Sequence, residues 1–296
     1  MHQLSNDNKL DSIKYDDNIL VYSSLKEFYH PVKSQGFAVK YVLEGVERYT
    51  LNGRKYDIEA GKYLLSNATT EGYVEIESHK SVKGICINIT PEVLSEVAAT
   101  MCRPDTPFSD IEMGQFFSSA LFLENCYDAQ RTNLGYLLHE MGKAMDGNDL
   151  LKIDLNMEFF YTISEKIIAD QIPIFKQLQA IPSIKSGTKK ELFRCISKGK
   201  EYIDTYFFMP LTIEAIAKEV CMSEYHFFRL FKSVYGVSPH QYILKKRLEL
   251  GQNILIQDKY SVSDAAYASG FSDIFAFSKA FKKHFGYSPS SLLKEK

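Results

Sequence analysis

The stretch FSDIFAFSKAFKKHFGYSP, residues 271–289, carries the signals of one short, capped helix. Ser272 or Asp273 can act as the N-cap, and apolar residues then recur at helical spacing. Gly286 can adopt the left-handed conformation that ends a helix, and Pro289 stops it from continuing. We therefore expect a compact helix with one apolar face.

The same phrase occurs fifty positions earlier, in FFRLFKSVYGVSP at residues 227–239, where Ser223, Gly236 and Pro239 take the equivalent places. A shorter apolar segment precedes each copy, TIEAIAKEVCM at residues 212–222 and SVSDAAYASGF at residues 261–271. Two short helices joined by a tight turn form a helix-turn-helix unit. Since there is no third copy, we expect one pair of such units and not a solenoid.

Each second helix should present a polar face opposite its apolar one, and we assign this face to DNA. Its residues are Tyr225, Phe228, Arg229 and Lys232 in the first unit, and Ile274, Phe275, Ser278, Lys279 and Lys282 in the second. Arginine can pair bidentately with guanine, and lysine can meet a base edge or a phosphate. The alternative is a solvated basic face. An exposed phenylalanine is costly, so for Phe228 the alternative to a DNA contact is that the helix is rotated about its axis from this assignment.

The second unit resembles the C-terminal signature of the AraC/XylS family of bacterial transcription regulators, through Asp264, Ala266 and residues 270–273, 277–283 and 286–289. The first unit resembles the family's first helix-turn-helix through Leu211, Ile216, Ala217, Ser223, His226, Arg229, Phe231, Lys232, Gly236, Ser238 and Pro239. Arg247, Leu248, Ile254 and Leu255 match the family's linking helix. The resemblance implies that a rigid helix holds both units, which enter successive major grooves on one face of DNA. Lys245, Lys246 and Arg247 on the linking helix could then meet phosphates, and the alternative is a solvated helix face.

The chain departs from the family pattern at several positions. Phe228, Ile274 and Phe275 stand where polar base-contacting residues are more common in the family, so the preferred DNA site cannot be carried over from it. Gly251 stands where the linking helix usually has alanine, which would cost about 1 kcal/mol of helix propensity. Ala265 replaces a larger aliphatic residue. The departures at Gly251 and Ala265 bear on stability more than on identity.

Charge is distributed unevenly along the 296 residues, whose net charge is −2. Up to Lys185 there are 18 Lys+Arg against 26 Asp+Glu, a net charge of −8, and beyond it 17 against 11, a net charge of +6. A basic C-terminal third suits contact with a polyanion such as DNA. The alternative is a chance difference between the surfaces of two domains.

The first half of the chain reads as strands followed by helices. The expected strands are FAVKYVL, ERYTL, RKYDI, KYLLS, YVEIE and KGICINI between Phe37 and Thr90, with a hairpin turn at Asn52-Gly53. Helices are expected from Pro91, from Thr132 to Met145 and from Asp154 to Asp170. We expect an α+β chain: a cupin-like antiparallel β-barrel with helices at residues 1–170, a linker at 171–190 around Pro173 and Pro182, and an all-α domain of two helix-turn-helix units joined by a long helix at 191–296.

The role of the first domain is left open between two hypotheses. In one it binds a small-molecule effector, and the candidate binding residues are Tyr41, Tyr49, Tyr56, Tyr63 and Tyr73. In the other it is a filled barrel that serves as a dimerisation or protein-partner module. The apolar stripe of residues 154–170 suits a dimer interface or packing against the barrel.

The sequence offers no sign of an enzyme. His30, His79 and His139 do not form the H-x-H cluster of a metal-dependent cupin, and five scattered cysteines include no C-x-x-C pair. We expect no cofactor, no metal and no catalytic residue. With no signal peptide or apolar run long enough for a membrane span, we expect a cytoplasmic homodimer that binds promoter DNA, works with RNA polymerase and activates transcription.

Overall fold

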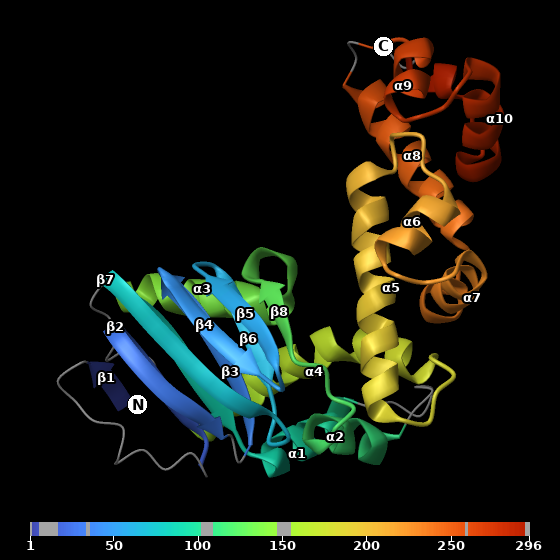
Figure 1. The fold of residues 1–296 in the computed structure, drawn as a ribbon. Helices are drawn as coiled ribbons and strands as arrows, with labels where there is room; N and C mark the ends of the chain where they lie inside the picture. The colour runs from blue at the N-terminus through green and yellow to red at the C-terminus, as the bar shows by residue number, and fades with distance from the viewer. Residues whose placement is uncertain are drawn as a thin grey trace. The chain divides into compact units, whose positions relative to one another are not determined.

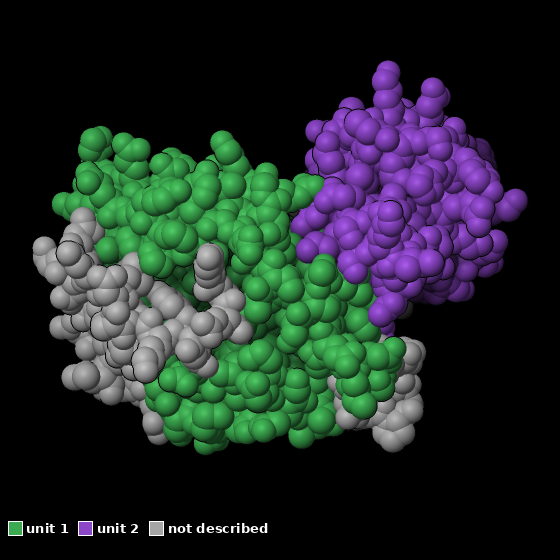
Figure 2. All heavy atoms as spheres, turned by 60° about the horizontal axis from the view of Figure 1, so that its bottom comes forward, with its two compact units in different colours: residues 1–175 green, residues 176–296 purple. Residues whose placement is uncertain are grey.

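The computed structural model describes residues 2–5, 17–33, 36–101, 109–146, 155–257 and 260–293. The chain divides into two compact units, residues 1–175 and 176–296, which are coloured separately in Figure 2. Among the described residues no helix is long and apolar enough to cross a membrane. The fold class is the expected one, a curled β-sheet with helices followed by an all-helical unit (Figure 1).

Unit 1 is built on an eight-stranded sheet that curls into a nearly closed barrel and is antiparallel except where β1 pairs with β2. The strands are β1 (His2–Ser5), β2 (Ile19–Lys33), β3 (Phe37–Glu44), β4 (Val46–Leu51), β5 (Arg54–Glu59), β6 (Lys62–Ser66), β7 (Glu71–Ile89) and β8 (Asn125–Asp128). The sheet is held together by β7, which pairs with β2, β3 and β4. The two strands expected within residues 73–89 are therefore one.

The hairpin turn between β4 and β5 is confirmed. Asn52 and Gly53 both have positive φ, 49° and 78°, as a two-residue turn between antiparallel strands requires. Asn52 also donates its side-chain amide to Glu124 Oε1 at 2.9 Å, which ties the turn to the segment before β8. The local sequence signal and the tertiary contact therefore agree.

In the described part of the chain, α1 (Pro91–Met101) and α2 (Asp110–Ser118) follow β7, and α3 (Asn133–Asp146) and α4 (Met157–Gln179) follow β8. Aromatic rings join α2 and the loop after it to the sheet, since Phe37 of β3 lies 5.4 Å from Phe117 and 5.0 Å from Phe122 between ring centroids. Phe116 of α2 contacts Phe175 of α4 at 4.9 Å. This aromatic cluster connects β3, α2 and α4.

Unit 2 contains the repeated phrase as two matching sets of three helices: α5 (Ser186–Tyr206), α6 (Ile213–Glu219) and α7 (Glu224–Tyr235), then α8 (Pro239–Ile256), α9 (Val262–Ala268) and α10 (Ile274–Phe285). Ser223 caps α7 and Asp273 caps α10, each through its side-chain oxygen. Gly236 and Gly286 end these helices with φ of 75° and 86°. The capped helices predicted from the sequence are confirmed.

The boundary between the two compact units falls within the segment expected as a linker, residues 171–190, but most of this segment is helical. Helix α4 continues through Pro173 to Gln179, and α5 begins at Ser186, so only residues 180–185 connect the two helices. Proline normally interrupts a helix. Here the apolar spacing continues across it, with Ile168 before it and Phe175 after it both buried, so packing outweighs the local signal.

Candidate nucleic-acid interface and barrel cavity

Helices α7 and α10 bury the faces that the sequence assigned to the core. Phe227 and Phe231 of α7 and Phe277 and Phe281 of α10 are fully buried. The opposite faces are therefore directed outward, and both helices lie at the same edge of unit 2 in Figure 1. This is the arrangement that a pair of recognition helices needs.

On α7 the outward residues include an organised pair. Arg229 donates from Nη1 to the Tyr225 hydroxyl at 3.0 Å, and its guanidinium lies 5.5 Å from the centre of the Tyr225 ring. Tyr225 is 70% exposed, so both side chains remain available to a ligand. Stacking on the ring reduces the freedom of the guanidinium, which keeps its remaining donors directed outward. Lys232 is exposed on the next turn.

Phe228 is half-buried, with its ring 6.3 Å from that of His240. The helix is therefore not rotated from the predicted orientation, because Phe227 and Phe231 are fully buried while Arg229 is exposed. Partial cover from the start of α8 accounts for a phenylalanine at the edge of the outward face.

On α10 the predicted residues divide into two groups. Phe275 is 87% exposed, and Lys279 and Lys282 are exposed with it. Ile274 is half-buried and packs against the core formed by Leu248, Phe277 and Phe281, while Ser278 is half-buried. Ile274 therefore supports the helix, and the freely accessible side chains of this face are Phe275 and the two lysines.

The linking helix α8 gives its basic residues other partners than the expected phosphates. Arg247 donates to the carbonyls of Phe207 and Met209, at 2.7 and 2.9 Å, and so closes the end of α5. Lys246 lies 3.2 Å from Asp204, and the exposed Lys245 lies 3.7 Å from Glu249. Arg247 therefore has a structural role at the end of α5.

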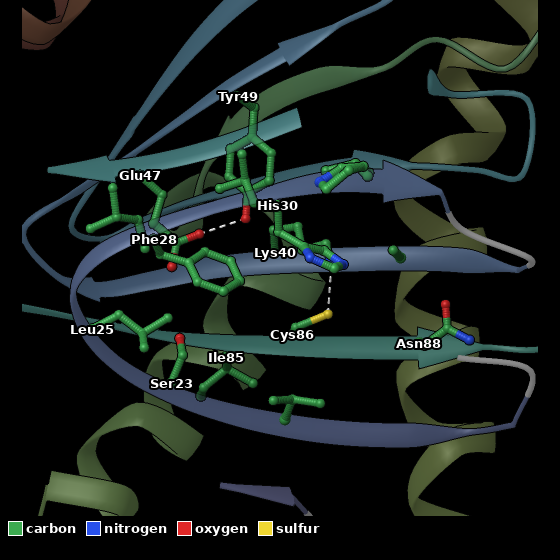
Figure 3. Close-up of a pocket in the computed structure, with 16 residues that line it drawn as sticks. Ser23, Leu25, Phe28, His30, Lys40, Glu47, Tyr49, Ile85, Cys86 and Asn88 are labelled. Carbon is green, nitrogen blue, oxygen red and sulfur yellow. Dashed lines mark hydrogen bonds between the residues drawn. The ribbon is translucent and has the colours of Figure 1, made fainter. Parts of the chain in front are cut away.

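Unit 1 contains a cavity of about 400 Å³ inside the barrel. Its walls come from β2, β3, β4 and β7, and are Val21, Ser23, Leu25, Phe28, His30, Pro31, Val32, Ala38, Lys40, Glu47, Tyr49, Val74, Ile76, Ile85, Cys86 and Asn88. The described side chains of the barrel therefore leave this space open. Most of the wall is apolar, with a few polar groups directed inward (Figure 3).

The polar part of the cavity centres on a buried carboxyl group. Glu47 is 6% exposed and accepts a hydrogen bond of 2.5 Å from the Tyr49 hydroxyl. Gly84 leaves room for it, since a Cβ there would lie 2.5 Å from Glu47 Oε1. Burial raises the pKa of Glu47, although the bond from Tyr49 and the charge of Lys40 oppose the shift. Lys40 enters from β3 and donates to Cys86 Sγ at 2.7 Å.

Of the five tyrosines predicted to bind an effector, only Tyr49 lines the cavity. Tyr41 follows Lys40 in the same strand and so faces away from it. Tyr63, its partner on β6, donates instead to Thr132 Oγ1 at 2.8 Å. Tyr56 donates to the Glu124 carbonyl at 3.3 Å, and Tyr73 contacts the Tyr29 ring at 5.2 Å.

The sequence prediction missed most of the cavity because it did not assign β2. Phe28, His30 and Val32 alternate along residues 28–32, which is a strand signal, and they supply one wall. Lys40 and Glu47 lie in strands that were predicted, but their inward direction depends on the register. Within the described part of the chain, no group of three or more His, Cys, Asp or Glu side chains is placed to hold a metal ion.

Two helix-turn-helix units with outward recognition faces define a DNA-binding protein, and comparison with known proteins agrees. A helix-turn-helix domain family matches residues 216–295. The Msm operon regulatory protein of Streptococcus mutans is 25% identical over 97% of this chain and 96% of its own length. The lactose operon transcription activator of Staphylococcus xylosus is 29% identical, but the match covers 50% of this chain and 48% of that protein.

Among solved structures, the DNA-binding domain of AdpA in complex with a target DNA is similar at 25% identity and a TM-score of 0.32, over 33% of this chain and 89% of that one. The class is a DNA-binding transcription regulator. These comparisons support an AraC/XylS-family transcription regulator, the family that the sequence resembles.

Proposed function

We propose that this regulator activates transcription by placing α7 and α10 in two successive major grooves of its promoter. The observation that carries the proposal is the outward placement of Arg229 and Lys279 at equivalent positions of two matching capped helices. Successive major grooves on one DNA face are about 34 Å apart, a spacing that the linking helix α8 would set. The name of the lactose operon activator supports the positive sign of regulation, which implies contact with RNA polymerase.

In this proposal the outward residues divide their work. Arg229, held by Tyr225, is suited to bidentate pairing with guanine O6 and N7. Lys279 would take a base edge or a phosphate, while Lys232 and Lys282 are one turn further along and would take phosphates. Phe228 and Ser278 lie at equivalent positions between these residues and would fill the groove at its edge. Ile274 would act indirectly, by holding the start of α10 on its core.

The test uses in vitro selection of random duplexes by the full-length protein, followed by affinity measurements at one fixed salt concentration. Arg229→Ala should weaken binding to the selected duplex by about 5- to 150-fold, the effect of losing a bidentate base contact, and should relax selection at one position. Lys279→Ala should weaken binding in the other half-site. Lys143→Ala removes the same charge from α3 of unit 1 and should leave affinity unchanged. Unchanged affinity in both recognition-helix variants would refute the assignment.

We also propose that the barrel cavity binds a small-molecule effector that controls DNA binding. A volume of about 400 Å³ falls within the range of small-molecule pockets, roughly 300–1,000 Å³. The wall combines apolar side chains with Lys40 and the Glu47–Tyr49 pair, which would fix the orientation of an amphipathic ligand. A cavity of this size favours the small-molecule hypothesis over a filled partner module.

Filling the cavity tests the effector proposal. Val74 is buried on the cavity wall, so Val74→Phe should extend a ring into the space. A compound from the host's metabolite extract that raises the melting temperature of the wild-type chain should not raise that of the variant, because ligand binding stabilises only the state that binds it. Val93→Ile, at a buried position of α1 outside the cavity, is the matched control. An equal response of both variants would refute the cavity as the effector site.

Dimerisation is part of the proposal, but not through the stripe of residues 154–170. Phe160, Ile163, Ile167 and Ile168 are buried within the chain itself, so this face of α4 packs internally. If two chains pair in the cytoplasm, they would do so through another surface of unit 1.

A further inference from the structure

Phe275 is a large apolar side chain at the start of α10, the point where a recognition helix meets base edges. It is the second residue of the helix and is 87% exposed, and Ala276 beside it is exposed as well. An isolated exposed apolar residue is ordinary on a protein surface. Its position, and not its exposure alone, gives Phe275 its significance.

The first helix-turn-helix unit has polar side chains at the positions equivalent to Phe275 and Ala276. Tyr225 and His226 are the equivalents of Phe275 and Ala276, and both are polar and exposed. The Tyr225 hydroxyl accepts a hydrogen bond from Arg229. Phe275 has no hydroxyl with which to hold the lysine that replaces this arginine. The first turn of α10 therefore presents two side chains, at 275 and 276, that can neither donate nor accept a hydrogen bond.

In the major groove, such side chains can recognise only one chemical group by attraction. The other base-edge groups are hydrogen-bond donors and acceptors, and covering them with a phenyl ring removes their water without replacing the lost bonds. The C5 methyl group of thymine is apolar and gains from the contact. Ala276 is small and permits a close approach of the helix start to the groove.

We propose that Phe275 makes the half-site under α10 select thymine through its C5 methyl group. The inference rests on the proposed entry of α10 into a major groove, and it adds the base that this helix selects. The two helix-turn-helix units would then recognise bases by different means, α7 through the hydrogen bonds of Arg229 and α10 through an apolar contact. Ile274 cannot share this role, because it packs against the core of the second helix-turn-helix unit.

The test compares thymine with uracil, which differ only in the methyl group. The selected duplex is bound by the full-length protein, and the half-site of α10 is assigned as the one whose contacts Lys279→Ala weakens. Each thymine in it is then replaced by deoxyuridine. One or two replacements should weaken wild-type binding about fourfold each, the factor expected for one buried methyl group. Phe275→Ala should bind both duplexes equally, while Phe275→Leu should keep part of the discrimination.

Two controls separate this contact from other effects. Replacements in the half-site of α7 should affect the wild-type chain and Phe275→Ala alike. Unfolding of Phe275→Ala by urea should match that of the wild-type chain, since the ring is outside the core. Equal wild-type binding of thymine and uracil throughout the α10 half-site, or discrimination that persists in Phe275→Ala, would overturn the inference and leave sequence-specific binding intact. Failure to select any sequence would instead refute the proposed function.

Discussion

Gly251 lies inside α8, where helix propensity alone favours alanine by about 1 kcal/mol. The structure gives the opposite expectation. A Cβ at this position would lie 2.6 Å from Cε2 and 2.9 Å from Cζ of Phe277, the buried anchor of α10. The first helix-turn-helix unit has the same contact, since a Cβ at Gly199 of α5 would lie 2.5 Å from Cε2 of Phe227. The glycines let α7 and α10 each seat a phenylalanine against the supporting helix.

Gly251→Ala should therefore destabilise the chain, by about 1–3 kcal/mol, because overpacking a rigid aromatic core outweighs the gain in propensity. Urea unfolding monitored on unit 2 measures the change. Gly187→Ala is the matched control, since Gly187 lies in the first turn of α5 and a Cβ there would have no neighbouring atom within 4 Å. The control should be neutral or stabilising by up to about 1 kcal/mol. A higher urea midpoint for Gly251→Ala than for the wild-type chain would contradict the packing argument.

At the scale of elements, one carboxylate joins α5 and α8, the helices that support the two helix-turn-helix units. Asp204 of α5 accepts from Lys200 at 2.7 Å, from the Tyr242 hydroxyl at 2.8 Å and pairs with Lys246 at 3.2 Å, the last two on α8. Burial alone would raise the pKa of Asp204, but the hydrogen bonds from Lys200 and Tyr242 and the charge of Lys200 outweigh it, so the pKa is lowered. The carboxylate thus stabilises the folded state in its charged form.

The stability from Asp204 should be present above its unfolded pKa of about 3.9 and be lost as the pH falls through the lower folded value. Asp204→Asn should cost about 1–2 kcal/mol at pH 7, and the difference from the wild-type chain should shrink below about pH 4. Urea midpoints measured from pH 7 to pH 2.5 give this difference. Glu249→Gln, in the exposed pair with Lys245 on α8, should change stability by less than about 1 kcal/mol at any pH. A constant cost of Asp204→Asn across the range would exclude this linkage.

The elements that the sequence predicted best are those whose signals are local. Caps, left-handed glycines and apolar spacing are all present within α7 and α10, so these helices and their buried faces could be predicted residue by residue. Pro173 misled because its local effect is overcome by the packing of Phe175 on Phe116, a contact distant in sequence. The cavity was missed for a similar reason, since the inward direction of Lys40 and Glu47 depends on strand register across β3, β4 and β7.

At the scale of the whole molecule, the position of the boundary between the units matters for DNA binding. The chain before α5 takes part in unit 2, because Ser233 of α7 donates to the Ala180 carbonyl at 2.6 Å. A fragment of residues 176–296 should therefore unfold at a higher urea concentration than one of residues 191–296, which also lacks the first turn of α5. Circular dichroism in the far ultraviolet, which reports helix, and in the near ultraviolet, which reports the packing of aromatic rings, measures the urea midpoint of each fragment. Equal midpoints would mean that residues 176–190 contribute nothing to unit 2.

The same fragment separates base reading from any contribution of unit 1. Residues 176–296 contain both recognition helices, so the fragment should select the same bases as the full chain. If unit 1 pairs two chains, the full chain should bind a duplex with two copies of the site about 100-fold or more tightly than the fragment does, because the second binding step becomes intramolecular. On a duplex with a single copy this advantage should disappear. The affinities of the full chain and the fragment are measured on both duplexes at one salt concentration. If the full chain binds more tightly than the fragment by the same factor on each duplex, the gain in affinity comes from direct contact of unit 1 with DNA and not from pairing of chains.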